Sequence, residues 1–156
     1  MQNLPQLNLP SFSSKIEWIQ NNRCIWDIIR KQYVVLTPEE WVRQHFVHLL
    51  ISHLNYPKGL FRVESNLKYD KKRKRSDIQV LNAAGNVFLL IECKAPTIEL
   101  NHNTLKQLSE YNKALEAQYL AITNGLKHFI WGYDKNSQEY RPLTDFPNYT
   151  VSKNSL

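Results

Sequence analysis

The segment from Ser76 to Lys94 constrains the fold most, because it predicts two strands joined by a tight turn. Its second half starts with the unbroken apolar run Val87–Ile91 and ends in Glu92-Cys93-Lys94. A run without polar alternation is typical of a strand that is buried on both faces of a sheet. A carboxylate and an ammonium group that end such a strand are costly unless they are paired or functional. The segment therefore predicts a central strand that carries charged side chains to one end of the core.

The turn between the two strands decides which side chains share a face. If the loop over Ala83–Asn86 has two or four residues, residues whose numbers sum to 169 pair, and Asp77 lies opposite Glu92. Lys94 then shares their face, because strand side chains alternate with a period of two. A three- or five-residue loop would shift the register by one and separate the two carboxylates.

Two interpretations of this strand end are open. Glu92 and Lys94 either form an ion pair on a solvated strand end, or they form a metal site together with Asp77. Like charges placed opposite each other destabilise a sheet, so two facing carboxylates indicate a cation between them. Hard oxygen ligands suit Mg²⁺ or Mn²⁺ better than Zn²⁺. The buried character of the strand favours the metal site.

The remaining hydrophobic patterns predict one α/β domain with a mixed sheet. Thr37-Pro38-Glu39-Glu40 is a helix start with a capping box, and this helix is expected to end near Asn55. A second helix is expected over Thr104–Ala117, where apolar residues recur at helical spacing. The expected strands are Lys15–Gln20, Arg23–Asp27, Leu60–Tyr69, Ser76–Asn82, Val87–Lys94, Gln118–Thr123 and Phe129–Tyr133.

The length of 156 residues is that of a single domain over residues 1–156. Residues 1–14, with two prolines, are expected to form an extended arm, and residues 134–156 a polar, loop-like tail. No apolar run is long enough for a membrane span, and the first ten residues lack the layout of a signal peptide. These features predict a cytoplasmic protein without a membrane partner.

A cluster of positive charge precedes Asp77. The net charge is +6, and five of the positive charges lie together in Lys71-Lys72-Arg73-Lys74-Arg75. Such a run next to a metal site favours contacts with the phosphates of a nucleic acid. The alternative is a solvated hairpin loop, which is the more common role of a charged run.

Several motifs, taken in order along the chain, resemble a known family. Asp77, followed after a hairpin by Glu92-Cys93-Lys94, resembles the PD-(D/E)xK nuclease superfamily. A longer set resembles the N-terminal nuclease domain of type I restriction enzyme R subunits over about residues 23 to 133. This set is Thr37-Pro38-Glu39-Glu40-Trp41-Val42-Arg43-Gln44, Tyr56-Pro57, Arg75-Ser76-Asp77, Glu92-Cys93-Lys94-Ala95-Pro96, Gln107-Leu108-Ser109-Glu110-Tyr111-Asn112 and Thr123-Asn124-Gly125.

The resemblance implies a restriction-endonuclease-like core and a metal-dependent nuclease that hydrolyses DNA phosphodiester bonds. Asp77 and Glu92 would hold Mg²⁺ or Mn²⁺, with the backbone carbonyl of Cys93 as a further ligand. Lys94 would orient the attacking water or stabilise charge that develops on the phosphate.

Residues of both helices are expected to border this site. The resemblance implies that Gln107 and Tyr111, which share one helix face, contact substrate or water. It also implies that Glu40 contributes an acidic group to the metal site. A role for Glu40 in the capping box is an equal alternative, and Glu39 is a substitute for it in the metal site.

Two departures from the family pattern bear on function. Ser76 stands where the family often has Pro, at a position that varies within the superfamily, and we expect the long helicase motor of the R subunits to be absent from this polypeptide. The partners to expect are DNA and separately encoded helicase or specificity subunits, and cutting both strands favours a homodimer. The alternative is a non-catalytic nucleic-acid-binding or assembly module that retains the nuclease fold.

Overall fold

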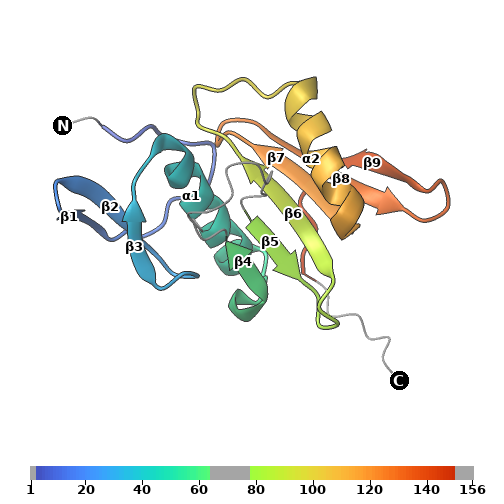
Figure 1. The fold of residues 1–156 in the computed structure, drawn as a ribbon, viewed down its shortest axis with the longest axis horizontal. Coiled ribbons are helices and arrows are strands. Elements are labelled where there is room, and N and C mark those ends of the chain that lie inside the picture. The colour runs from blue at the N-terminus through green and yellow to red at the C-terminus, as the bar shows by residue number, and fades with distance from the viewer. Residues whose placement is uncertain (1–2, 64–77, 150–156) are drawn as a thin grey trace.

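The structure of the chain, a computed structural model, describes residues 3–63 and 78–149, which form two β-sheets and two α-helices (Figure 1). The smaller sheet has the order β1-β2-β3, with β1 (Ile16–Ile19), β2 (Asn22–Asp27) and β3 (Gln32–Val35). The larger sheet follows sequence order and contains β4 (Phe61–Val63), β5 (Ile78–Leu81), β6 (Val87–Cys93), β7 (Tyr119–Thr123), β8 (His128–Asp134) and β9 (Glu139–Leu143). The helices are α1 (Pro38–His53), α2 (His102–Leu115) and the short 3-10 helix η1 (Lys58–Leu60).

The larger sheet is mixed, as expected. Strands β6 and β7 pair in parallel, and the other neighbouring strands of the described sheet pair antiparallel. A parallel pair needs a crossover connection, which α2 supplies between β6 and β7. The chain therefore has an α/β fold with a central mixed sheet and flanking helices, consistent with a restriction-endonuclease-like core.

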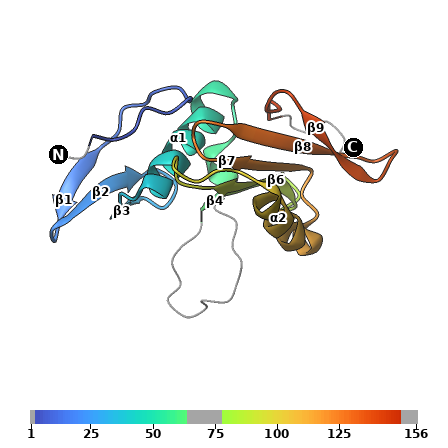
Figure 2. The same cartoon turned by 90° about the horizontal axis from the view of Figure 1, so that it is seen from above.

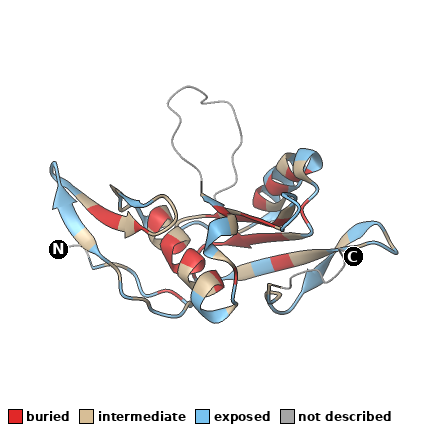
Figure 3. Cartoon of the chain, turned by 90° about the horizontal axis from the view of Figure 1, so that it is seen from below, coloured by how far each residue is buried: buried red, intermediate tan, exposed pale blue. Residues whose placement is uncertain are grey.

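The two helices cover opposite faces of this sheet (Figure 2). On one face, Val42 and Phe46 of α1 join a core that includes Ile91 and Cys93. On the other face, Leu108 of α2 packs in a separate cluster of apolar side chains with Leu90, Leu120 and Ile122. Because β6 contributes to both cores, its central residues are buried on both faces (Figure 3).

The body of the β5–β6 hairpin has the expected register, but the turn has a different length from the expected one, and a bulge makes up the difference. The pairs Ile78–Ile91 and Val80–Leu89 have numbers that sum to 169. At the turn, however, Leu81 pairs with Val87, so a bulge shifts the register by one between the turn and the strand body. Asp77 lies outside the described residues, and its pairing with Glu92 stays a prediction.

Two strands were not expected. Gln32–Val35 forms β3, and Glu139–Leu143 forms the edge strand β9 in a region where we expected a loop-like tail. Most residues of β9 are exposed, so the strand lacks the apolar alternation that predicts a half-buried strand. Its proline is tolerated because an edge strand need not donate every backbone hydrogen bond.

The other bounds differ from those expected by a few residues, and residues 64–69 of the expected strand Leu60–Tyr69 lie outside the description. Residues 3–14 form no helix or strand and run along the body of the protein. They are fixed by the Trp41 Nε1–H, which donates to Pro5 O at 2.9 Å, and by Asn8 N, which donates to Gly125 O at 2.8 Å. Neither α1 nor α2 is long and apolar enough to cross a membrane, nor is any other helix in the described part.

Candidate active site

The C-terminal end of β6 presents an ion pair. Lys94 Nζ lies 3.1 Å from Glu92 Oε1, and the two side chains are 27% and 18% exposed. Strand pairing fixes both residues: Glu92 pairs with Ile122 of β7, and Lys94 N donates to Thr123 O at 2.8 Å. The two side chains were predicted to lie on one face, and they meet at the edge of the core, where solvent reaches them.

A contact between β5 and α2 lies on the same face of the sheet as Glu92. Gln79 pairs with Leu90, which is two residues before Glu92 and therefore points to the same side. Gln79 Nε2 donates to Tyr111 Oη at 3.5 Å, so α2 is joined to this face through Tyr111. Gln107, one turn earlier, is exposed, and its contact with substrate stays a prediction. Gln79 was not predicted as a site residue, although its spacing of two from Asp77 places both side chains on one face of the expected strand.

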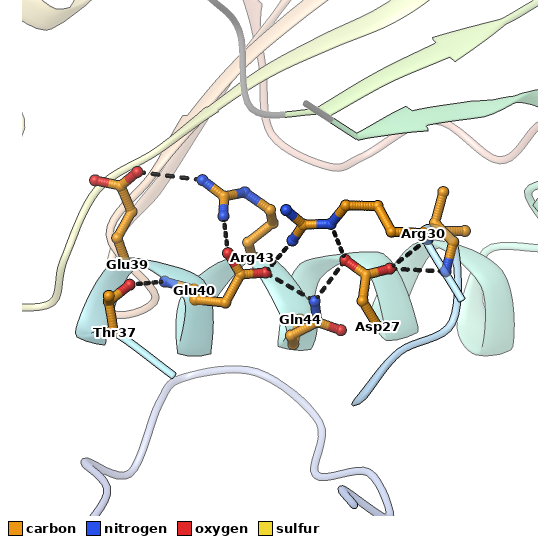
Figure 4. A network of polar contacts seen from close by, with 8 residues as sticks. Asp27, Arg30, Thr37, Glu39, Glu40, Arg43 and Gln44 are labelled. Atoms are coloured by element: carbon orange, nitrogen blue, oxygen red, sulfur yellow. Dashed lines mark hydrogen bonds and ion pairs between the residues drawn. The ribbon is translucent and has the colours of Figure 1, made fainter. Parts of the chain in front are cut away.

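Glu40 begins a second polar cluster on α1 (Figure 4). Thr37 caps this helix, because its Oγ1 accepts a hydrogen bond from Glu40 N at 3.0 Å. The second half of the expected capping box is absent: Thr37 N donates to Val35 O at 3.1 Å instead of to the Glu40 carboxylate. The carboxylate is therefore available for other contacts.

These contacts form a closed ring with the end of β2. Arg30 Nε donates to Asp27 Oδ2 at 2.6 Å, and Arg30 Nη2 donates to Glu40 Oε1 at 2.5 Å. Gln44 Nε2 donates to the same two oxygens, at 3.0 Å to Asp27 and 2.9 Å to Glu40. Asp27, Arg30, Glu40 and Gln44 are called the Asp27–Glu40 ring below. Asp27, Arg30 and Gln44 were not predicted as site residues from the sequence, because their contacts depend on the docking of the smaller sheet on α1.

Arg43 extends this ring toward Glu39. It donates to Glu40 Oε2 through Nη1 and to Glu39 Oε1 through Nη2, the latter at 3.2 Å. Glu39 is 44% exposed at its side chain, whereas the Glu40 side chain is almost covered. The structure therefore gives Glu40, rather than Glu39, the buried and highly connected position.

The electrostatics of the ring favour an ionised Asp27. Burial alone would raise the pKa of Asp27, but the backbone N–H and guanidinium of Arg30 and the amide of Gln44 together lower this pKa below its ordinary value. Gln44 Oε1 is buried and accepts no hydrogen bond from a described residue, because the amide nitrogen is turned toward the two carboxylates. The amide orientation is thus set by two negative charges.

The described residues supply part of the expected metal-binding set. The Glu92 carboxylate is a hard oxygen ligand of the kind that Mg²⁺ and Mn²⁺ prefer, and its partial exposure fits such a role. The Cys93 side chain points into the core that α1 covers, so only its backbone carbonyl could act as the expected metal ligand. Among the described residues no three His, Cys, Asp or Glu side chains form a group that could hold a metal. Asp77 and the basic run Lys71–Arg75 lie outside these residues, and the convergence of Glu40 with Glu92 on one ion stays a prediction.

The Thr123-Asn124-Gly125 motif has a structural role. Asn124 Oδ1 accepts from Leu126 N at 3.0 Å and from Lys127 N at 2.8 Å, which closes the turn after β7. Asn124 Nδ2 donates to Ile98 O at 2.9 Å and so fixes the loop that follows Lys94. This motif supports the strand end that carries the Glu92–Lys94 pair.

Comparison with known proteins gave a family match and a structural similarity. The family model described as "Type I restriction enzyme R protein N terminus (HSDR_N)" matches residues 38–147. A solved fragment assigned as an HsdR subunit of a type I restriction enzyme from Vibrio vulnificus YJ016 is 16% identical, with a TM-score of 0.48. The match covers 72% of this chain and 24% of that one, so the chain spans about a quarter of that structure. No curated protein matches the chain.

Proposed function

Because this chain belongs to the family of type I restriction enzyme R protein N termini, we propose that it is a metal-dependent nuclease that hydrolyses DNA phosphodiester bonds. The observation that carries the proposal is the Glu92–Lys94 pair at the end of β6, on the sheet face that Tyr111 of α2 also reaches. An acidic ligand and a cation 3.1 Å apart fit the acidic and basic positions of a PD-(D/E)xK site.

The proposed site divides its roles among few residues. Asp77, Glu92, the Cys93 carbonyl and Glu40 would hold Mg²⁺ or Mn²⁺, which when bound polarises a phosphate oxygen and lowers the pKa of water. Lys94 places a positive charge where negative charge develops on the phosphate, and Glu92 keeps the Lys94 ammonium at the strand end. Gln107 and Tyr111 would orient substrate or water, and Lys71–Arg75 would contact phosphates.

The proposed partners are DNA and other subunits of a restriction–modification system. One proposed site cuts one strand, so a homodimer, or two successive encounters, would be needed to cut both. A homodimer is therefore part of the proposal.

A cleavage assay with matched variants tests the proposal. Purified protein is incubated with supercoiled plasmid and with single-stranded DNA in the presence of Mg²⁺ or Mn²⁺. Glu92→Gln and Lys94→Ala should each lower the rate by roughly 10²- to 10³-fold, whereas the exposed-residue variants Glu139→Gln and Lys135→Ala should match wild type. DNA binding without metal-dependent cleavage would contradict the nuclease proposal and favour a non-catalytic binding module.

A further inference from the structure

Two residues that precede the family-matched segment are linked to a proposed site residue: Arg30 donates directly to Glu40, and Asp27 accepts from Arg30. The match begins at residue 38, whereas Asp27 and Arg30 lie at and just after the end of β2. We propose that Asp27 and Arg30 are positioning residues of the nuclease site, which hold the Glu40 carboxylate in a single orientation. This inference rests on the proposed function, in which Glu40 is one of the metal-binding carboxylates.

The position of Asp27 is set by its own turn and does not depend on Glu40. Its Oδ1 accepts hydrogen bonds from Ile29 N and Arg30 N, both at 2.8 Å, and Lys31 N donates to Asp27 O at 2.8 Å. The other oxygen, Oδ2, accepts from Arg30 and Gln44. Asp27 therefore has a fixed position, and it orients Arg30 and Gln44, which both donate to Glu40 Oε1.

The ring leaves Glu40 one defined acceptor position. A carboxylate has about four lone-pair sites. Oε1 of Glu40 accepts from Arg30 and Gln44, and Oε2 accepts from Arg43. The remaining site is on Oε2, because the ring occupies Oε1.

Burial of the ring restricts the Glu40 carboxylate to one orientation. Asp27 is 1% exposed and Gln44 is 0% exposed, so water does not compete for their contacts with Arg30 and Glu40. Figure 4 shows that Arg43 extends from α1 and Arg30 from the turn after β2, and that both reach the Glu40 carboxylate. A free glutamate samples several rotamers, whereas this one is held by three side chains at once.

The choice of arginine agrees with a positioning role. The planar guanidinium uses two different nitrogens, Nε and Nη2, to bridge the two carboxylates. A lysine keeps the charge but has a single nitrogen and no rigid fork. Partners that orient ligands in this way commonly change metal affinity by about 10- to 100-fold when they are replaced.

The test compares Arg30→Lys with Arg141→Lys, in which another arginine of an Arg–Asp pair is replaced. Arg141 lies 3.1 Å from Asp134 on the exposed edge of the larger sheet. Two quantities are measured as Mg²⁺ is raised: the DNA cleavage rate, and the melting temperature of the full chain without DNA. Arg30→Lys should need about tenfold more Mg²⁺ for half of either effect, with unchanged affinity for DNA in the absence of metal. Arg141→Lys should match wild type.

A second variant shows whether the effect of Arg30→Lys comes from a folding defect. Asp27→Asn keeps the shape of the side chain and should raise the Mg²⁺ midpoint in the same way. If wild type cleaves DNA and both variants keep its Mg²⁺ midpoints, the positioning role is wrong and the nuclease proposal stands. If wild type is stabilised by Mg²⁺ but does not cleave, the nuclease proposal fails, and the melting midpoints still decide the role of the ring. If Mg²⁺ neither stabilises nor activates wild type, both proposals fall.

Discussion

Glu40 combines a helix-start position with a buried carboxylate. Its backbone N–H completes the Thr37 cap, and its side chain contacts Arg30, Arg43 and Gln44. The sequence Thr37-Pro38-Glu39-Glu40 predicts a capping box whether the second glutamate bonds back to the Thr37 N–H or forms buried contacts elsewhere. The two roles of Glu40 therefore cannot be told apart from the sequence. The difference arises from Thr37 N, which finds its acceptor in Val35 O at the end of β3.

Glu40→Gln should lower the free energy of unfolding by about 3 kcal/mol, because it removes the negative charge that two buried guanidinium groups share. The Arg30 and Arg43 side chains are each only 11% exposed, so water compensates little. Glu39→Gln, on a half-exposed neighbour that also contacts Arg43, should cost less than about 1 kcal/mol. Urea denaturation of both variants measures the difference. Equal losses would show that the buried contacts of Glu40 contribute no more than a surface ion pair.

Among the secondary-structure elements, those with a strong local signal were predictable from the sequence. The apolar run of β6 and the Thr37-Pro38 start of α1 both appear where expected. Strands β3 and β9 were not predictable, since they are short, have no buried residue and depend on pairing with a neighbour. The β5–β6 register was predicted through the wrong loop length, because a bulge cannot be read from alternation alone. The contact of Asp27 with Gln44 of α1 was not predictable either, because it joins segments that are distant in the sequence and no local pattern indicates it.

Two glycines with the same backbone conformation, one in the turn after β7 and one in the β5–β6 turn, allow a test of how the arm packs on the body of the protein. Gly125 and Gly85 both have φ +84°, so an alanine at either position costs about 1 kcal/mol of backbone strain. A Cβ at Gly125 would also lie 2.8 Å from Leu7 Cδ2 and 3.0 Å from Val42 Cγ2, whereas Gly85 has open space. Gly125→Ala should therefore cost roughly 1–3 kcal/mol more than Gly85→Ala in thermal or urea unfolding. Similar losses would mean that the arm residue Leu7 moves away without cost.

For the molecule as a whole, the charge distribution predicts a salt-dependent interaction with DNA. The net charge is +6, and the run Lys71–Arg75 accounts for most of the excess. Each phosphate neutralised contributes about −0.9 to the slope of log affinity against log salt. Replacing the five residues by Ser should flatten the slope by about 2.7 to 4.5 units if three to five contacts are lost. Replacing the exposed residues Lys113, Lys127 and Lys135 by Ser is the control, and an equal change there would indicate a non-local charge effect.

The N-terminal arm, residues 3–14, is held against the body by three histidines, which predicts that acid destabilises the folded chain. Phe12 stacks on His48 at 4.0 Å between ring centroids and meets the edge of His45 at 4.8 Å, and His128 Nε2 donates to Asn8 O at 3.1 Å. Burial lowers the pKa of all three imidazoles in the folded chain, and for His48 the charges of His45 and Lys58 add to this effect while Asp27 opposes it.

The sign of the pH effect follows from these lowered pKa values. In the unfolded chain a histidine has a pKa near 6.5, so below about pH 6.5 the unfolded chain binds more protons than the folded one. The stability is therefore fully present above that pH and is lost as the pH falls below it. The melting temperature should drop between about pH 7.5 and pH 5.5, and His128→Gln, which keeps a donor for Asn8 O, should reduce this drop. His53→Gln, at the exposed end of α1, should leave the drop unchanged. A pH-independent melting temperature, or equal effects of the two substitutions, would show that the arm is not fastened through neutral histidines.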